Sequence, residues 1–299
     1  MSQVEWRGVF PALTTKFSAD GSFDWEAMSS HLEFQLDAGV HGIVILGSLG
    51  ENSTMDKSEK AEVVRFFASA ERRGRPLIVT LAERSTRRAC EFAESCEKAG
   101  AHGLMVLPPM GYQGDKRETL AYLRAVADAS SLPIMLYNNP IAYGTDLTPA
   151  DFADLADNPC FQAIKESSGD TRRITEIQRL TGDRYAIYCG IDDLAFECLS
   201  LGAVGWIAGL VVAFPHETVR IFELMQMGKW REARAIYDWF LPLLALDTGP
   251  FFIHQIKLVE ELVGVGNARL RPPRLQLPDA RIAEIKGIVD RALESRPAL

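Results

Sequence analysis

The chain has 299 residues, of which 47% are apolar and 24% charged, and this composition excludes a disordered protein or a collagen-like repeat. A net charge of −8 argues against non-specific binding to nucleic acids or anionic membranes, and no apolar run approaches the ~18 residues of a membrane span. The five cysteines show no CxxC spacing and predict the reduced thiols of a cytoplasmic protein. The first ten residues, MSQVEWRGVF, lack the basic and apolar regions of a secretory signal, so we expect none.

Short apolar runs alternate with segments of helical periodicity along the first three quarters of the chain. The runs lack a strict alternation of apolar and polar residues, which is typical of parallel strands covered on both faces. We expect eight strands, at Gly8–Thr15, Gly42–Leu46, Pro76–Leu81, Gly103–Leu107, Pro133–Tyr137, Gln162–Lys165, Tyr185–Cys189 and Val204–Ala208.

The segments between these runs predict helices. Three similar phrases, AGVHGIVIL, AGAHGLMVL and LGAVGWIAG, form a weak internal repeat, as expected of repeated βα units. The expected helices include Trp25–Ala38, Ser58–Arg73, Thr86–Lys98, Lys116–Ala129 and Pro149–Ala156.

Eight strands with connecting helices predict an α/β fold, a (β/α)8 TIM barrel over residues 1–226. A doubly wound open sheet is the alternative, but the segment after the first strand, KFSADGSFDW, lacks the GxGxxG motif of that fold. Residues 227–299 contain no strand pattern and predict a C-terminal three-helix extension. Because no flexible linker precedes it, we expect the extension to pack on the barrel as part of a single structural unit.

Chemistry in such a barrel gathers at the C-terminal ends of the strands. Lys165 interrupts the apolar run of the sixth strand, where a buried amine loses its proton readily and becomes a nucleophile suited to forming a Schiff base. A lysine that reaches solvent or pairs with Glu166 is the alternative. Tyr137 ends the preceding strand and is expected to lie beside Lys165, where a phenol can transfer protons; a core tyrosine with a satisfied hydroxyl is the alternative.

The segment GSLGEN, residues 47–52, follows the second strand as a glycine-rich turn. Its backbone N–H groups are suited to binding a carboxylate, although a plain βα turn is equally consistent with the sequence. Asp192 and Asp193 are expected to cap a helix rather than to act as catalytic acids. The five histidines show no HExxH or HxH spacing and no GxSxG motif occurs, so we expect neither a metal site nor a serine hydrolase.

Together these residues resemble the dihydrodipicolinate synthase and N-acetylneuraminate lyase family of Schiff-base enzymes. The resemblance covers nearly the whole chain and includes GVFPALTTKFSADGSFD, the G-S-L-G-E turn, the Tyr137-Asn138-x-Pro140 motif, I-K-E-S-S-G-D and GIDD. It implies that Lys165 forms the Schiff base, so that no separate cofactor is needed, that Tyr137 shuttles protons, and that Ser48 belongs to the proton relay. The substrate-binding residues that it implies are Gly47, Ser48, Leu49, Asn139 and Ile207, with the Leu49 N–H and the Ile207 carbonyl group acting through the backbone.

Two departures from the family pattern concern the substrate. Ala142 stands where the synthases have an arginine that clamps the carboxylate of the second substrate, and losing such a bond costs about 1.5–3 kcal/mol. Leu49 makes the anion-binding turn more apolar. The combined motifs resemble the branch that deaminates 1-pyrroline-4-hydroxy-2-carboxylate to 2-oxoglutarate semialdehyde and ammonia in hydroxyproline catabolism. The alternatives are a pyruvate-dependent aldolase or synthase, such as a 4-hydroxy-tetrahydrodipicolinate synthase or a 2-keto-3-deoxy acid lyase, and a catalytically silent barrel.

The resemblance also implies a homotetramer built as a dimer of dimers. In the family, one of two paired tyrosines in the loop after the fourth strand reaches into the site of the neighbouring subunit. Here that loop reads Pro109-Met110-Gly111-Tyr112, and it stays open whether Tyr112 takes this role. The expected partner is a small 2-oxo acid or cyclic imine substrate, with no nucleic acid and no membrane.

Overall fold

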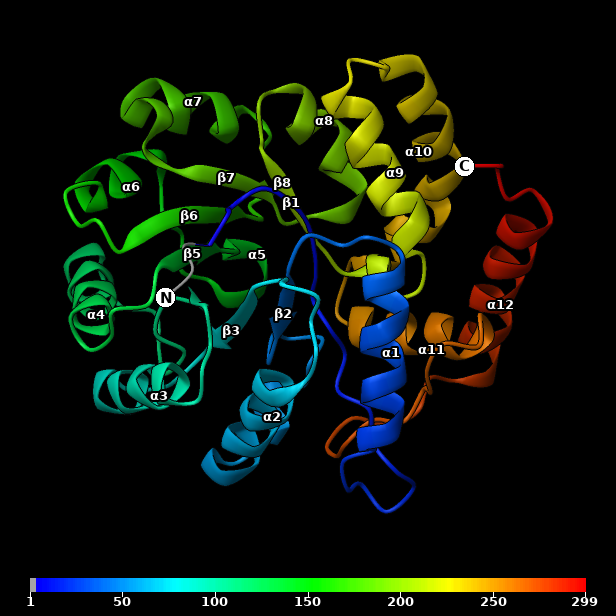
Figure 1. Cartoon of the computed structure of the whole chain (residues 1–299), viewed down its shortest axis with the longest axis horizontal. Coiled ribbons are helices and arrows are strands. Elements are labelled where there is room, and N and C mark those ends of the chain that lie inside the picture. The colour runs from blue at the N-terminus through cyan, green and yellow to red at the C-terminus, as the bar shows by residue number, and fades with distance from the viewer. Residues whose placement is uncertain (1–3) are drawn as a thin grey trace.

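The eight predicted strands form one parallel sheet in the computed structural model, which describes residues 4–299 (Figure 1). Its order is β1-β8-β7-β6-β5-β4-β3-β2, and a parallel bridge between Ala12 and Val44 brings the two outer strands together. The predicted (β/α)8 barrel is thereby confirmed. The strands are β1 (Gly8–Pro11), β2 (Ile43–Ile45), β3 (Leu77–Leu81), β4 (Gly103–Val106), β5 (Ile134–Asn138), β6 (Phe161–Glu166), β7 (Ala186–Cys189) and β8 (Gly205–Ala208).

The strands are buried on both faces, which explains why their sequences do not alternate. Each strand differs from its predicted range by at least one residue, and the first and sixth strands serve as examples. The first strand ends at Pro11 and not at Thr15, because the side chain of Thr15 turns to the Gly50 carbonyl and the chain leaves the sheet there. The sixth strand is longer than predicted and runs from Phe161 to Glu166.

Helices follow the strands and surround the sheet (Figure 1). The predicted helix Ser58–Arg73 ends early, at Ser69, because the Arg72 guanidinium donates to the carbonyl groups of Ala68 and Ala70 and closes the last turn. The helices of this part are α1 (Trp25–Asp37), α2 (Lys57–Ser69), α3 (Thr86–Lys98), α4 (Lys116–Asp128), α5 (Pro140–Tyr143), α6 (Pro149–Leu155), α7 (Arg172–Thr181), α8 (Ala195–Ser200) and α9 (Pro215–Gln226).

Three α-helices form the C-terminal extension, as predicted: α10 (Trp230–Leu244), α11 (Phe252–Leu262) and α12 (Asp279–Glu294). The Trp239 indole donates to the Ala292 carbonyl group and joins the first of these helices to the last. The extension also contacts the barrel directly, since Arg296 pairs with Glu217 of α9. The division of the chain into barrel and extension stays a prediction, and its boundary lies in the connection from α9 to α10.

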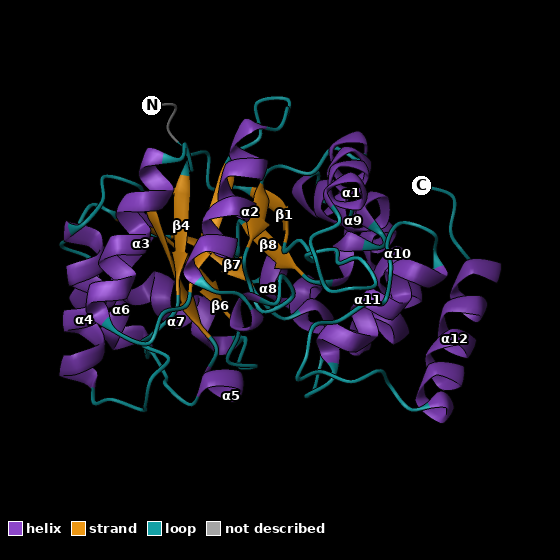
Figure 2. Cartoon of the chain, turned by 90° about the horizontal axis from the view of Figure 1, so that it is seen from below, coloured by secondary structure: helices purple, strands orange, loops and turns teal. Residues whose placement is uncertain are grey.

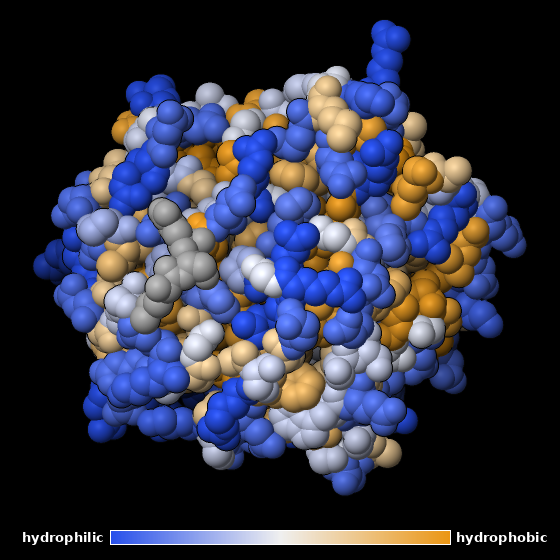
Figure 3. Space-filling model, in the orientation of Figure 1, coloured by the Kyte–Doolittle hydropathy of each residue, from blue (hydrophilic) through white to orange (hydrophobic). Residues whose placement is uncertain are grey.

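Figure 2 shows the short helix α5 beyond the strand ends, at the end of the barrel where chemistry is expected. Figure 3 shows the opposite end, whose surface is mainly hydrophilic, with apolar residues gathered on the side of α9, α10 and α12. Among residues 4–299, no helix has both the length and the apolar character that a membrane crossing requires.

Candidate active site

Lys165 and Tyr137 lie side by side at the C-terminal ends of two neighbouring strands. They are register partners in the parallel pairing of β5 with β6, and the Lys165 Nζ lies 4.2 Å from the centroid of the Tyr137 ring. Both side chains are buried, with 8% and 7% of their surface exposed. The structure thus brings together the two residues that the sequence predicts to act as nucleophile and proton shuttle.

The amine of Lys165 lies over the aromatic ring of Tyr137. Glu166, the partner considered in the sequence analysis, accepts instead from the Asn138 amide at 3.2 Å. Lys16 and Lys257, two fully buried lysines, each pair with a buried carboxylate, whereas no ion pair within residues 4–299 involves the Lys165 amine. Burial lowers the pKa of Lys165, because its charged form loses solvation there. At a given pH, a larger fraction of the Lys165 amine is therefore neutral and nucleophilic than in an exposed lysine.

Gly190, at the end of β7, leaves the space that Lys165 occupies. A Cβ atom at this glycine would lie 2.0 Å from the Ser167 Oγ and 2.7 Å from both Cγ and Cε of Lys165, closer than real Cβ atoms approach. Any side chain at position 190 would therefore displace the amine. The glycine of the GIDD segment is thus required by packing against the candidate nucleophile.

The hydroxyl group of Tyr137 is held by Asn139. The Asn139 amide nitrogen donates to the Tyr137 hydroxyl oxygen at 3.2 Å, and the Asn139 carbonyl oxygen accepts from the Ala142 N–H at 3.0 Å. Burial raises the pKa of Tyr137, so this phenol keeps its proton at neutral pH and is available as a donor. Asn139, predicted to bind substrate, is therefore placed where it orients the proton shuttle.

Ser48 contacts a residue that the sequence analysis did not select. Its Oγ is hydrogen-bonded to the hydroxyl group of Tyr143, on α5. The Tyr143 ring packs edge-on against the Tyr137 ring, with the centroids 5.9 Å apart and the planes at 84°. The motif YNNPIAYG is the sequence feature that indicates Tyr143, because an aromatic residue three positions after a helix-starting proline lies one turn further along that helix.

The turn at residues 47–50 presents its backbone to the same end of the barrel. The N–H groups of Ser48 and Leu49 take part in no backbone hydrogen bond of the turns and loops among residues 4–299, whereas the N–H of Glu51 returns to the Ser48 carbonyl group. The Leu49 side chain is buried and cannot donate a hydrogen bond. This arrangement leaves backbone donors for an anion, in line with the predicted carboxylate site.

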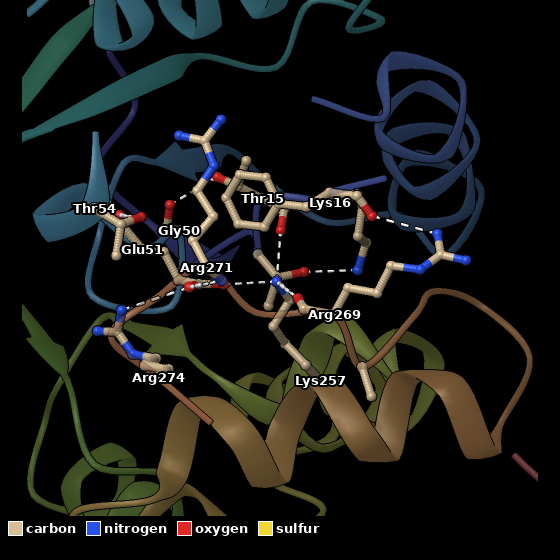
Figure 4. Close-up of polar contacts among 12 residues, drawn as sticks. Thr15, Lys16, Gly50, Glu51, Thr54, Lys257, Arg269, Arg271 and Arg274 are labelled. Atoms are coloured by element: carbon tan, nitrogen blue, oxygen red, sulfur yellow. Dashed lines mark hydrogen bonds and ion pairs between the residues drawn. The ribbon is translucent and has the colours of Figure 1, made fainter. Parts of the chain in front are cut away.

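A buried ion pair holds this turn from the side of the C-terminal extension (Figure 4). Glu51 adopts a left-handed conformation with φ of 53°, and its carboxylate pairs with Lys257 of α11 at 2.7 Å. The same ammonium group donates to the Thr15 carbonyl at 2.8 Å, and the Thr15 hydroxyl donates to the Gly50 carbonyl at 2.7 Å. The extension therefore contributes to the shape of the candidate carboxylate site.

Asp192 does not cap the helix that follows it, so this prediction is wrong. Its buried carboxylate accepts from the Trp206 indole at 2.9 Å and from the backbone N–H groups of Gly209 and Leu210 at 3.1 and 2.7 Å. Asp193 makes no side-chain cap, but it lies in the first turn of the 3-10 turn η3 (Asp192–Leu194), where a negative charge is favourable, as predicted. Asp192 instead secures the chain where it leaves β8, because the side chain turns inward across the barrel.

Asp247, at the end of the 3-10 turn η5 (Ala245–Asp247), brings a carboxyl group from the extension to the end of β8. A Cβ atom on Gly209 would lie 2.6 Å from Asp247 Oδ1, so this glycine leaves room for the carboxyl group. Burial and the neighbouring Asp192 raise the pKa of Asp247, against the opposing effect of Lys165. A carboxyl group with a raised pKa keeps its proton to a higher pH than an exposed aspartate and is suited to donating it. No sequence pattern marks Asp247 as a site residue, because it lies outside the barrel strands.

The other predicted residues lie as follows. Ile207 is buried in β8, at the register position of Phe10 in β1. Tyr112 is 63% exposed, and its hydroxyl group lies near Glu118, which raises the pKa of Tyr112. The tyrosine of this chain that is hydrogen-bonded to Ser48 is Tyr143 and not Tyr112. No group of three or more metal-ligating side chains occurs among the described residues.

Comparison with known proteins points to one family. The model of the Dihydrodipicolinate synthetase family matches residues 5–292. A 4-hydroxy-tetrahydrodipicolinate synthase from Clostridium perfringens is 32% identical over 280 residues, which cover 93% of this chain and 95% of the relative. The synthase of the same name from Haloarcula marismortui is 30% identical over 293 residues, covering 97% and 94% of the two chains.

Solved structures agree with this match over the whole fold. YagE, a prophage protein of the dihydrodipicolinic acid synthase family from E. coli K12 solved in complex with pyruvate, superimposes with a TM-score of 0.90 at 27% identity. The alignment covers 97% of this chain and 99% of that one. A putative dihydrodipicolinate synthetase from Pseudomonas aeruginosa superimposes with the same TM-score at 30% identity and covers 96% and 99% of the two chains.

Proposed function

This chain belongs to the Dihydrodipicolinate synthetase family of Schiff-base-forming lyases and synthases, and on that premise we propose that it deaminates 1-pyrroline-4-hydroxy-2-carboxylate. The observation that supports a Schiff base at Lys165 is its buried amine, which lies over the Tyr137 ring and forms no ion pair within residues 4–299. The observation that favours this substrate is Ala142, which offers no charge to a second carboxylate. The cyclic imine carries only one carboxylate, for which the N–H groups of the turn at residues 47–50 suffice.

The residues of the site account for each step of the reaction. The Lys165 amine adds to the imine carbon that bears the carboxylate, and the ring nitrogen leaves as a primary amine with a proton from Tyr137. Loss of a proton from the neighbouring methylene gives an enamine, which expels the 4-hydroxyl group as water. The carboxyl group of Asp247, whose pKa is raised by burial, is suited to supply that proton. Tautomerisation places an imine at the amine-bearing carbon. Hydrolysis of this imine and of the Schiff base releases ammonia and 2-oxoglutarate semialdehyde, with a net uptake of one water.

The second candidate is a pyruvate-dependent aldolase or synthase. It is supported by the relatives that are 4-hydroxy-tetrahydrodipicolinate synthases and by the structural neighbour solved with pyruvate. In this reaction Lys165 condenses with the keto group of pyruvate, and the enamine attacks an aldehyde or is formed by cleavage of a longer 2-oxo acid. Both candidates need the same Lys165, Tyr137 and Ser48, so they differ in the second half of the reaction.

An assay panel separates the two candidates. The purified protein is given hydroxypyrroline carboxylate, with ammonia release measured, and in parallel pyruvate with aspartate semialdehyde, with pyruvate consumption measured. We expect rapid ammonia release and little condensation. The opposite pattern would overturn the deaminase proposal and support the synthase. Failure of both substrates and of 2-keto-3-deoxy acids would contradict both candidates.

Ala142→Arg tests the argument about the second carboxylate. Ala142 is exposed on α5, so the larger side chain fits without disturbing the core. A charge-assisted bond of about 1.5–3 kcal/mol is expected to raise kcat/KM for aspartate semialdehyde roughly 10- to 150-fold. Ala142→Gln, which has a comparable length without the charge, is the control and is expected to change little. Equal gains in the two variants would show that the charge is irrelevant.

A further inference from the structure

The hydroxyl groups at the candidate site come from three segments of one chain. Ser48 follows β2, Tyr137 ends β5, and Tyr143 lies on α5. The Ser48 Oγ and the Tyr143 hydroxyl are hydrogen-bonded although the residues are 95 positions apart, and the Tyr143 ring touches the Tyr137 ring at right angles. Tyr143 therefore connects the turn at residues 47–50 with the phenol beside Lys165.

The position of Tyr143 is determined by the same residue that orients Tyr137. Asn139 accepts from the Ala142 N–H and so starts the single turn of α5, while its amide nitrogen donates to the Tyr137 hydroxyl. Pro140 occupies the first position of this turn, and Gly144, with φ of 77°, ends it directly after the tyrosine. Asn139 therefore holds both tyrosines in place.

The chemistry of a Schiff base needs such a connection. When the Lys165 amine adds to a substrate carbon, the group that leaves takes a proton from Tyr137, and the phenolate must be reprotonated before the next step. Burial raises the pKa of Tyr143, so that this phenol also keeps its proton at neutral pH and can pass it on. Tyr112 is 63% exposed in this chain and lies beside Glu118, away from the hydroxyl groups of Ser48 and Tyr143 that are bonded to each other.

We propose that Tyr143 completes the proton relay Tyr137–Tyr143–Ser48 from within the same chain, so that no tyrosine of a neighbouring subunit is needed. The proton that Tyr137 gives to the leaving group is replaced from the Tyr143 hydroxyl, which recovers it from Ser48 and the solvent at the turn. No atom is gained or lost in this exchange. The inference rests on the proposed Schiff-base chemistry at Lys165, but it applies to the deaminase and to the synthase alike.

Tyr143→Phe removes only the hydroxyl group and tests the role in catalysis. We expect kcat to fall about 10²-fold with KM nearly unchanged, because a general acid–base group contributes 10²- to 10⁴-fold and water replaces part of the relay. Tyr112→Phe is the matched control and is expected to keep the full rate. Thermal melting verifies that both variants are folded. A full rate in Tyr143→Phe, or a loss in Tyr112→Phe instead, would overturn the inference.

A double-mutant cycle separates a relay from a packing role. Ser48→Ala and Tyr143→Phe interrupt the same chain of hydroxyl groups, so the double variant is expected to lose little more rate than the worse single variant. Additive losses would mean that the two residues act independently. They would contradict the proposed relay.

Mixed subunits decide whether Tyr143 acts within its own chain. Lys165→Ala and Tyr143→Phe chains are co-expressed with different tags, and the hybrid assembly is purified through both. If Tyr143 serves its own subunit, no site in the hybrid has both the Lys165 amine and the Tyr143 hydroxyl, and activity stays at the level of Tyr143→Phe. Recovery of up to half the wild-type rate per chain would show that Tyr143 acts across subunits. If the protein is a monomer, the relay lies within one chain.

Borohydride trapping separates failure of the relay from failure of the proposed function. Absence of any borohydride adduct on wild-type Lys165 would refute the proposed function itself, whereas an adduct with a fully active Tyr143→Phe would refute only the relay.

Discussion

Replacement of Lys165 by alanine is expected to abolish turnover and covalent trapping while the fold is kept. The loss should exceed the ~10⁴-fold that a general acid or base contributes, because the covalent path itself is removed. The side chain is buried but makes no ion pair within residues 4–299, so its removal leaves no orphaned carboxylate and costs little stability. Wild-type protein treated with substrate and borohydride is expected to gain one adduct on the peptide that contains Lys165, as measured by mass spectrometry.

The pH dependence of this trapping follows from the environment of the amine. Burial lowers the pKa of Lys165, so the neutral amine is available at a lower pH than that of an exposed lysine. Trapping is therefore expected to speed up as the pH rises through this lowered pKa, and to fade below it. Lys16 and Lys257 serve as internal controls, because both are held in ion pairs with Glu260 and Glu51. An adduct on either of them in place of Lys165 would overturn the assignment of the nucleophile.

Replacement of Lys257 by methionine is expected to lower the free energy of unfolding by about 3–5 kcal/mol. The substitution keeps the length of the side chain but removes the nearer of the two cations beside the fully buried Glu51 carboxylate and leaves only Arg274, at 3.5 Å. It also frees the Thr15 carbonyl group and so loosens the turn at residues 47–50 (Figure 4). Urea unfolding measures the loss of stability, and KM for the substrate is expected to rise because the backbone donors of the turn lose their fixed position.

Two further variants make this prediction specific. Lys57→Met removes an exposed ion pair with Glu91, and it is expected to change stability by less than about 1 kcal/mol. Adding Glu51→Gln to Lys257→Met removes a buried charge that has lost its nearer partner and is expected to recover part of the stability. If Lys257→Met unfolds at the same urea concentration as the wild-type protein, the ion pair does not hold the turn.

The predictions that succeeded depended on local periodicity. The apolar runs and helical segments predicted eight strands and the three C-terminal helices, because burial on both faces imposes a pattern that needs only neighbouring residues to be recognised. The pairing of Lys165 with Tyr137 could also be predicted, since parallel strands that follow one another in sequence are neighbours in a barrel. The subtype was inferred from single positions such as Ala142, and it stays a prediction.

The parts of the site that were missed depend on contacts between distant segments. Tyr143 reaches Ser48 across 95 positions, and Lys257 reaches Glu51 across 206. Asp192 was expected to cap its own helix but turns to the backbone beyond β8, and Asp247 enters the site from outside the barrel. No periodic pattern marks such residues, because their positions follow from how loops and helices pack and not from the strand on which they lie.

The sequence by itself therefore determined the barrel, the family and the lysine with its neighbouring tyrosine. Repeated βα units and a charged residue within an apolar strand leave a signal in a short stretch of chain. Only the tertiary structure decided which groups surround that lysine. Tyr143, Asp247 and the ion pair below the turn at residues 47–50 come together because the closed sheet brings the ends of all strands, and the helices packed on them, to one place.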